Sequence, residues 1–212
     1  MNKIAIIDYG AGNLFSVSSA LKRVASKQNA EIEILITNDA TELGNASHII
    51  LPGVGAFADC INNLRGCDGM IAAMNEQVFN HNKPFLGICV GMQMLFDYGN
   101  EYGRHAGLGW LKGEIMPLSA SPDLRVPHMG WNELRKLRPH PLLNGVNDGD
   151  DVYFVHSYYA ICENETDMLA TTDYGCIIPA IIGKNNIMGT QFHPEKSHDI
   201  GATILNNFLS LF

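Results

Sequence analysis

Several sequence features are absent from this chain of 212 residues, and their absence excludes whole classes of protein. The longest apolar run, Ile177–Ile182, is far shorter than the about 20 residues that span a bilayer, so we expect no membrane partner. Basic residues are scarce, because 14 Lys and Arg stand against 22 Asp and Glu. The resulting net charge of −8 argues against a nucleic-acid partner, which requires a basic face.

Signals for bound groups are also missing. The five cysteines include no Cys-x-x-Cys pair, and the histidines include no His-x-x-x-His pair, so we expect no metal. No Gly-Lys-Ser/Thr phosphate loop occurs, so we expect no nucleotide and no other cofactor. The cysteines are odd in number, and Asp8 interrupts the apolar start of the chain, unlike a signal peptide. These features favour reduced thiols and a cytoplasmic location.

What the chain does contain is apolar sequence in a regular pattern. Hydrophobic residues make up 46% of the sequence and charged residues 17%, which excludes disorder. Short apolar runs at 3–8, 32–36, 47–51 and 84–88 alternate with segments of helical spacing, including Met92, Leu95 and Phe96 after the fourth run. This alternation predicts βαβ units and a parallel sheet.

The second half of the chain shows a different pattern. Apolar runs follow one another closely, and we expect strands at 113–118, 132–137, 152–161, 168–172, 177–183 and 187–191, followed by a closing helix over 200–212. The fold class that we predict is α/β, with a mostly parallel central sheet flanked by helices and added antiparallel strands in the C-terminal half. We expect residues 1–212 to form one domain.

The strongest local signal is Gly87-Ile88-Cys89-Val90-Gly91. It has the form of a nucleophile elbow, in which a sharp turn between a strand and a helix exposes the central side chain at the carboxyl edge of the sheet. Glycines two positions on either side remove Cβ atoms that would clash across such a turn. The alternative is a buried cysteine in a glycine-rich turn.

A cysteine nucleophile needs a base, and His193 follows the last expected strand in Gln191-Phe192-His193-Pro194-Glu195. Glu195 is close enough in sequence to accept the second N–H of the imidazole and to fix its tautomer, as in a catalytic triad. Taken alone, His193 is better explained as a turn histidine with satisfied hydrogen bonds. Together with the elbow, the pair favours a catalytic role.

Acyl transfer also needs donors for an oxyanion. Pro52-Gly53-Val54-Gly55 follows the third expected strand, beside the fourth strand of a doubly wound sheet. A glycine-rich segment there can present the N–H of Val54, with the N–H of Val90 as the second donor. A plain turn is the alternative.

These stretches together resemble a known family. GICVGMQ, PGVG and QFHPEKS resemble the class I, triad-type glutamine amidotransferases. DYGAGN, PHMGWNEL and YFVHSYYA extend the resemblance over nearly the whole chain and are similar to glutaminase subunits that supply ammonia to a separate synthase.

The resemblance implies roles for named positions. Cys89 would attack the side-chain amide of glutamine, His193 would transfer protons, and Glu195 would orient the imidazole. A γ-glutamyl thioester would form and be hydrolysed. Positions that match the family's substrate-binding segments are Gly53, Gly55, Gln93, Glu101, Ser157 and Tyr158.

The resemblance also implies a protein partner. Ammonia would pass directly into a (βα)8-barrel cyclase subunit, and the two chains would form a heterodimer. The positions that match the family's interface are Asn13, Trp131, Tyr153 and Lys196. A core position is the alternative for Trp131, and a solvated loop acid is the alternative for Glu101.

Three other hypotheses remain open. The chain could supply ammonia to a different synthase, for example one that amidates surface sugars. It could be another Cys-His hydrolase of the same fold, such as a peptidase, although the PGVG segment and Gln93 speak against this. It could also be a non-catalytic module that stabilises a barrel partner, although all three triad positions are filled.

Overall fold

A twisted eight-stranded sheet runs through the molecule in the computed structural model, which describes residues 2–119 and 124–211. The strand order is β2-β1-β3-β4-β14-β13-β12-β9. The first five of these strands pair in parallel, and the last three pair antiparallel with their neighbours. Their bounds are β1 Asn2–Ile7, β2 Ile32–Thr37, β3 His48–Gly53, β4 Phe85–Cys89, β9 Arg135–Lys136, β12 Met168–Asp173, β13 Ile177–Lys184 and β14 Ile187–Thr190.

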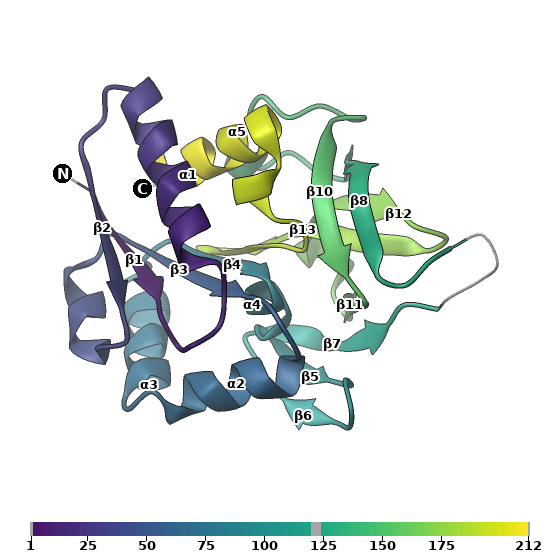
Figure 1. Ribbon diagram of the computed structural model, residues 1–212, viewed down its shortest axis with the longest axis horizontal. Coiled ribbons are helices and arrows are strands. Elements are labelled where there is room, and N and C mark those ends of the chain that lie inside the picture. The colour runs from purple at the N-terminus through teal and green to yellow at the C-terminus, as the bar shows by residue number, and fades with distance from the viewer. Residues whose placement is uncertain (1, 120–123, 212) are drawn as a thin grey trace.

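Helices cover both faces of the parallel part of this sheet (Figure 1). Helices α1 and α5 lie on one face and pack on each other, and α2 and α3 lie on the opposite face. The helical bounds are α1 Leu14–Lys27, α2 Phe57–Gly66, α3 Met70–Asn75, α4 Val90–Gln93 and α5 His198–Leu209. Short helical turns lie at η1 Ala40–Asn45, η2 Glu76–Asn80, η3 Pro141–Leu143, η4 Glu165–Asp167 and η5 Pro194–Lys196.

Two smaller sheets stand beside the carboxyl edge of the parallel strands. A four-stranded sheet has the order β11-β7-β5-β6, and a two-stranded sheet pairs β10 with β8. Their bounds are β5 Phe96–Gly99, β6 His105–Ala106, β7 Leu111–Pro117, β8 His128–Glu133, β10 Asp151–His156 and β11 Tyr158–Cys162. These observations confirm an α/β fold whose second half adds antiparallel strands.

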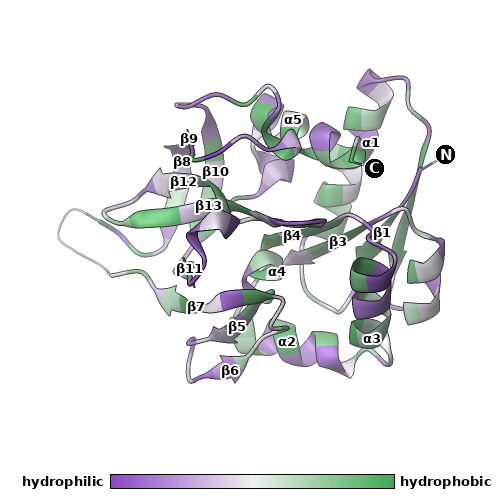
Figure 2. Ribbon diagram, turned by 180° about the vertical axis from the view of Figure 1, so that it is seen from behind, coloured by the Kyte–Doolittle hydropathy of each residue, from purple (hydrophilic) through white to green (hydrophobic). Residues whose placement is uncertain are grey.

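The core follows the central sheet. Residues 4–7 of β1, 49–51 of β3 and 85–86 of β4 have no exposed surface, because helices cover both faces of these strands. Figure 2 shows apolar colour along β3 and β13. No helix of the described residues is long and apolar enough to cross a membrane.

The prediction of a helix that includes Phe96 is wrong. Helix α4 ends at Gln93, and Phe96 begins β5. The carbonyls of Met94, Leu95 and Phe96 accept hydrogen bonds from backbone N–H groups in the segment 108–111. Those carbonyls are therefore unavailable to continue a helix.

The single strand expected over 152–161 is also wrong. The strand is interrupted at Ser157, because β10 pairs with β8 whereas β11 pairs with β7 in a different sheet. Likewise, the strand expected over 132–137 is divided into β8 and β9. The closing helix begins and ends earlier than expected, and residue 212 lies outside the described residues.

Candidate active site

Cys89 lies at the turn between β4 and α4. Its backbone has φ 54° and ψ −112°, a conformation that an L-residue adopts only where the surrounding structure imposes it. A Cβ at Gly87 would lie 2.7 Å from the carbonyl oxygen of Gly91, and a Cβ at Gly91 would overlap the carbonyl oxygen of Leu51 in β3. The flanking glycines thus permit the close approach of β4, α4 and β3, and the elbow predicted from the sequence is confirmed.

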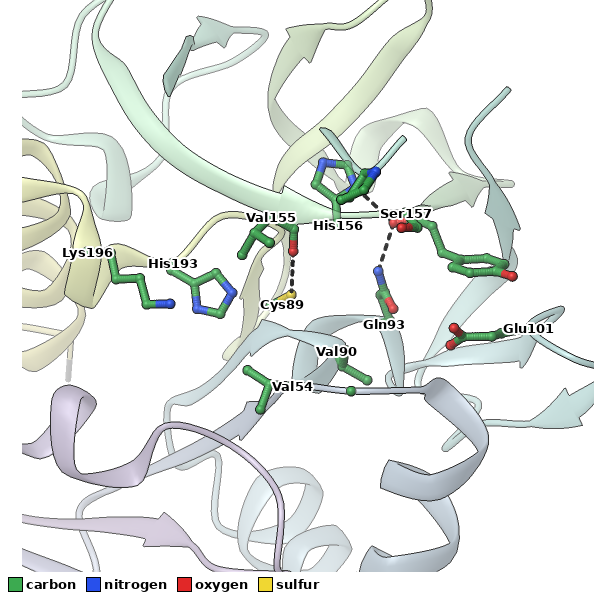
Figure 3. A pocket seen from close by; sticks show the side chains of 13 residues that line it. Val54, Cys89, Val90, Gln93, Glu101, Val155, His156, Ser157, His193 and Lys196 are labelled. Carbon is green, nitrogen blue, oxygen red and sulfur yellow. Dashed lines mark hydrogen bonds between the residues drawn. The ribbon is translucent and has the colours of Figure 1, made fainter. Parts of the chain in front are cut away.

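The Cys89 side chain lines a pocket of about 360 Å³. Cys89 as a whole is 4% exposed but borders the cavity, so a small molecule in the pocket would reach it. His193 lines the same pocket from the loop after β14, and Figure 3 shows its imidazole beside the thiol. Residues 104 positions apart in sequence therefore meet at one edge of the sheet.

The imidazole of His193 is held from behind by Glu195. The His193 Nδ1 and a Glu195 carboxylate oxygen are 2.8 Å apart, and both side chains are nearly fully buried. A carboxylate only accepts, so Nδ1 carries the proton and Nε2 is left as the basic nitrogen. Nε2 is buried and has no hydrogen-bond partner among the described residues.

The electrostatics of His193 follow from its neighbours. Burial lowers the pKa of the imidazole, but interaction with the Cys89 sulfur and with the Glu195 carboxylate outweighs burial and raises it to about 9. Once Nε2 has taken the proton of the Cys89 thiol, a pKa in this range lets the imidazolium keep that proton at neutral pH until a leaving group accepts it.

The glycine-rich segment after β3 forms another side of the pocket. Val54 and Gly55 line the cavity, and so does Val90 at the first position of α4, where a backbone N–H has no partner within the helix. Gly53 instead pairs with Cys89 between β3 and β4 and is not among the lining residues. A Cβ at Gly53 would lie 2.5 Å from the Gly91 nitrogen, so this glycine serves close packing.

The other expected substrate-binding residues also lie together. Gln93, Glu101, Ser157 and Tyr158 all line the pocket. Figure 3 shows Gln93, Glu101 and Ser157 on the side away from His193. Glu101 accepts a 2.6 Å hydrogen bond from the N–H of Phe57 at the first position of α2, so it is not simply a solvated loop acid.

Three of the four expected interface residues lie close together beside the pocket. Trp131 of β8 lies opposite Tyr153 of β10, with ring centroids 5.9 Å apart, and the Nζ of Lys196 lies 6.0 Å from the Tyr153 ring centroid. Trp131 is 47% exposed, so it is not a core aromatic. Lys196 also lines the pocket. Asn13 lies apart in sequence, at the start of α1, and is half-buried.

Sequence reasoning missed several polar groups around the pocket. Gln191 is fully buried with its amide at the Cys89 sulfur. His156 lines the pocket, and its Nε2 lies 2.9 Å from the Nδ1 of buried His128. The Val155 carbonyl oxygen lies 3.9 Å from the sulfur. Gln191 could have been suspected because it begins the QFHPE stretch that carries His193 and Glu195. The Val155 carbonyl could not, because a backbone carbonyl leaves no mark in the sequence.

Known proteins are similar to this chain in sequence and in fold. The sequence profile of the family described as "Glutamine amidotransferase class-I" matches residues 5–211. The imidazole glycerol phosphate synthase subunit HisH of Rhodospirillum rubrum is 48% identical over 98% of both chains, and the protein of the same name from Brucella abortus strain 2308 is 46% identical over 98% of both chains.

A solved structure supports the fold at lower identity. A glutamine amidotransferase of Thermotoga maritima superposes with a TM-score of 0.63 at 17% identity, over 92% of this chain and 76% of that one. The family profile covers the elbow, the glycine-rich segment and the His193 loop alike. The chain belongs to the class I glutamine amidotransferase family.

Proposed function

We propose that this chain is the glutaminase subunit of imidazole glycerol phosphate synthase in histidine biosynthesis. It hydrolyses glutamine and delivers the ammonia to a cyclase subunit. The observation that carries the proposal is the juxtaposition of Cys89, on a strained elbow, with the buried His193–Glu195 pair in one pocket. The similarity to HisH chains along the whole length supports the choice of synthase.

The first half of the reaction is acyl transfer to sulfur. His193 Nε2 takes the thiol proton, and the Cys89 sulfur forms a bond to the side-chain carbonyl carbon of glutamine. The carbonyl oxygen becomes an oxyanion, which the N–H groups of Val54 and Val90 stabilise. When the oxyanion collapses, the C–N bond breaks and the nitrogen receives the proton from His193. Ammonia is released, and a thioester between the Cys89 sulfur and the γ-glutamyl group remains.

The second half of the reaction restores the enzyme. His193 Nε2 takes a proton from water, and the hydroxyl oxygen bonds to the thioester carbon. The C–S bond then breaks, the sulfur regains its proton from His193, and glutamate is released. Glu195 stays ionised throughout and holds the imidazole in the required tautomer.

The substrate's amino-acid group is bound at the opposite end of the pocket. The Glu101 carboxylate attracts the α-ammonium, because an ionised acceptor forms a strong charge-assisted hydrogen bond. Gly55 lines the glycine-rich side, Gly53 allows this segment to pack closely on α4, and Gln93, Ser157 and Tyr158 form the remaining contacts. This arrangement places the side-chain amide of glutamine at the sulfur.

The ammonia is used by a second protein. A (βα)8-barrel cyclase covers the pocket and forms a heterodimer through a face that includes Asn13, Trp131, Tyr153 and Lys196. Ammonia then reacts with the ribonucleotide bound to the barrel and gives imidazole glycerol phosphate and AICAR. We further propose that residues 1–212 act as one domain, without a cofactor or metal, in the cytoplasm. All five cysteines carry free thiols, which supports that location.

A coupled assay tests the proposal. The chain is purified with a (βα)8-barrel cyclase and its ribonucleotide substrate, and glutamate release from glutamine is measured together with formation of the imidazole product. A glutamine analogue with an electrophilic carbon is expected to abolish turnover and to add mass at Cys89. Labelling at another cysteine, or no glutamate release in the complete mixture, would refute the proposal.

A further inference from the structure

Gln191 lies beneath the pocket as a buried amide that the proposed reaction does not use. It follows the last residue of β14 and has no exposed surface. Its backbone N–H donates to the Ala180 carbonyl at 2.9 Å, and this bond fixes the Gln191 backbone beside β13. It is not among the residues that line the pocket, so it does not contact a molecule bound there.

The orientation of the Gln191 amide follows from its neighbours. Gln93 Nε2 donates to the backbone carbonyl oxygen of Tyr158 at 2.9 Å, and this oxygen can only accept. The second hydrogen of the same nitrogen goes to Gln191 Oε1 at 3.0 Å. The Gln191 oxygen therefore faces Gln93, and its NH₂ group faces the Cys89 sulfur at 3.8 Å.

The sulfur has two polar contacts of opposite kind besides the imidazole of His193. The Val155 carbonyl oxygen, 3.9 Å away, accepts from the thiol S–H. The Gln191 NH₂ group donates to the sulfur. Loss of the thiol proton removes the first interaction and strengthens the second, because a thiolate is a better acceptor than a thiol.

We propose that Gln191 is a positioning residue, whose amide holds the Cys89 thiolate at the elbow and links it through Gln93 to the Tyr158 carbonyl. The role as a positioner for catalysis rests on the proposed glutaminase function. The donor interaction with the sulfur rests on the contacts alone. Gln191 acts through Cys89 and Gln93, and it does not touch the substrate.

Several titratable groups face the sulfur or the pocket, His156 among them, and within the described residues the Gln191 side chain shares a hydrogen bond only with Gln93 and Cys89. His193 lies beside the sulfur with Glu195 behind it, and Tyr9 and Cys60 lie on the side of β1 and α2. Lys196 and Glu101 line opposite ends of the pocket. A change in the behaviour of Cys89 in a Gln191 variant is therefore assigned to the amide.

The test is the rate at which iodoacetamide alkylates Cys89, measured on the full chain across pH 5 to 10 by site-resolved mass spectrometry. Gln191→Met keeps the length of the side chain and removes the donor. We expect the rate at pH 7 to fall about threefold to tenfold, and the midpoint of the rate profile to move to higher pH. Gln191→Glu puts an acceptor in place of the donor, so its shift is larger.

Two controls separate positioning from general damage. Cys67, a half-buried free thiol at the end of α2, reports on reagent and pH within the same molecule. Thr190→Val is the matched variant, because the Thr190 hydroxyl is buried one residue away without a hydrogen-bond partner among the described residues. We expect Thr190→Val to leave the Cys89 profile unchanged.

The outcomes are decisive in each case. A folded Gln191→Met chain with the wild-type Cys89 profile would overturn the proposal, and so would equal changes at Cys67. Loss of the folded state in both Gln191 variants would assign the residue a structural role and would also overturn it. Alkylation needs neither glutamine nor a partner. The alkylation result can therefore be interpreted even if the glutaminase assay fails.

Discussion

The two parts of the molecule that meet at the pocket differ in how they build it. The parallel part, β1–β4 and β14 with their helices, supplies the expected reacting groups through side chains at strand ends, as with Cys89 and His193. The antiparallel part, β5–β13, in which only β5 and β7 pair in parallel among the described residues, supplies a wall where backbone carbonyls of Val155 and Tyr158 hold thiol and amide groups. In the proposed mechanism, the parallel part provides the reacting groups and the antiparallel part holds them in position.

Replacement of the proposed nucleophile tests the first half of this comparison and has the largest expected effect. Cys89→Ser keeps the size of the side chain but removes the thiolate, so glutamate release by the complex with the cyclase is expected to fall by about 10⁴-fold or more. Cys67→Ser is the matched control, since this cysteine lies outside the pocket lining. Full activity in Cys89→Ser would show that the parallel part does not supply the nucleophile.

Backbone packing around the elbow gives the next largest effect. In Gly91→Ala the new Cβ overlaps a backbone oxygen of β3, so we expect a loss of at least about 3 kcal/mol in the free energy of unfolding. Gly66→Ala at the end of α2 meets no atom within 4 Å and is expected to change stability by less than about 1 kcal/mol. Urea unfolding of the two variants measures the difference. Equal midpoints would mean that the elbow is not tightly packed.

The parallel part could be predicted from the sequence because its signals are local. Each strand, turn and helix lies within a short window, and Gly87-Ile88-Cys89-Val90-Gly91 specifies both the turn and the exposed side chain. Cys89 and His193 line one pocket and Glu195 bonds His193 from behind, which agrees with that prediction. Their catalytic roles stay a prediction until the variants are assayed.

The antiparallel part was predicted less well because its structure depends on distant pairings. Phe96 belongs to a strand only because residues near 110 occupy the carbonyls that a helix would need. The break at Ser157 reflects pairing with two different sheets, and the apolar run itself carries no sign of it. Gln191 was missed because its partners are an amide and a sulfur about 100 residues away.

The outer face of the antiparallel part gives a third prediction. In Trp131→Ala the half-exposed indole is lost, and an aromatic anchor at an interface is typically worth about 2 kcal/mol, so binding to the cyclase is expected to weaken about 30-fold. Phe79→Ala, which removes another half-exposed aromatic on the parallel part, is the control and is expected to bind normally. Calorimetry measures both. Equal affinities would place the partner elsewhere.

The last expected effect is a pH dependence of opposite sign for two groups of histidines, with His128 and His156 of the antiparallel part in one group and His193, after β14, in the other. Burial lowers the pKa of His128 to about 4, and burial together with the charge of His128 lowers the pKa of His156 to about 3. Both bind protons more readily in the unfolded chain, so their stabilisation is complete above about pH 6.5 and is lost as the pH falls through about 4 for His128 and about 3 for His156.

His193 acts in the reverse direction, because its pKa in the folded chain is raised to about 9. Its stabilisation is complete below about pH 6.5 and is lost as the pH rises through 9. In Glu195→Gln one cause of the raised pKa is removed, so the alkaline loss of unfolding free energy is expected to flatten while the acid loss stays. His128→Gln is expected to flatten the acid side alone. Urea unfolding at several pH values compares the two variants, and a variant that flattened both sides would show that the two parts titrate as one unit.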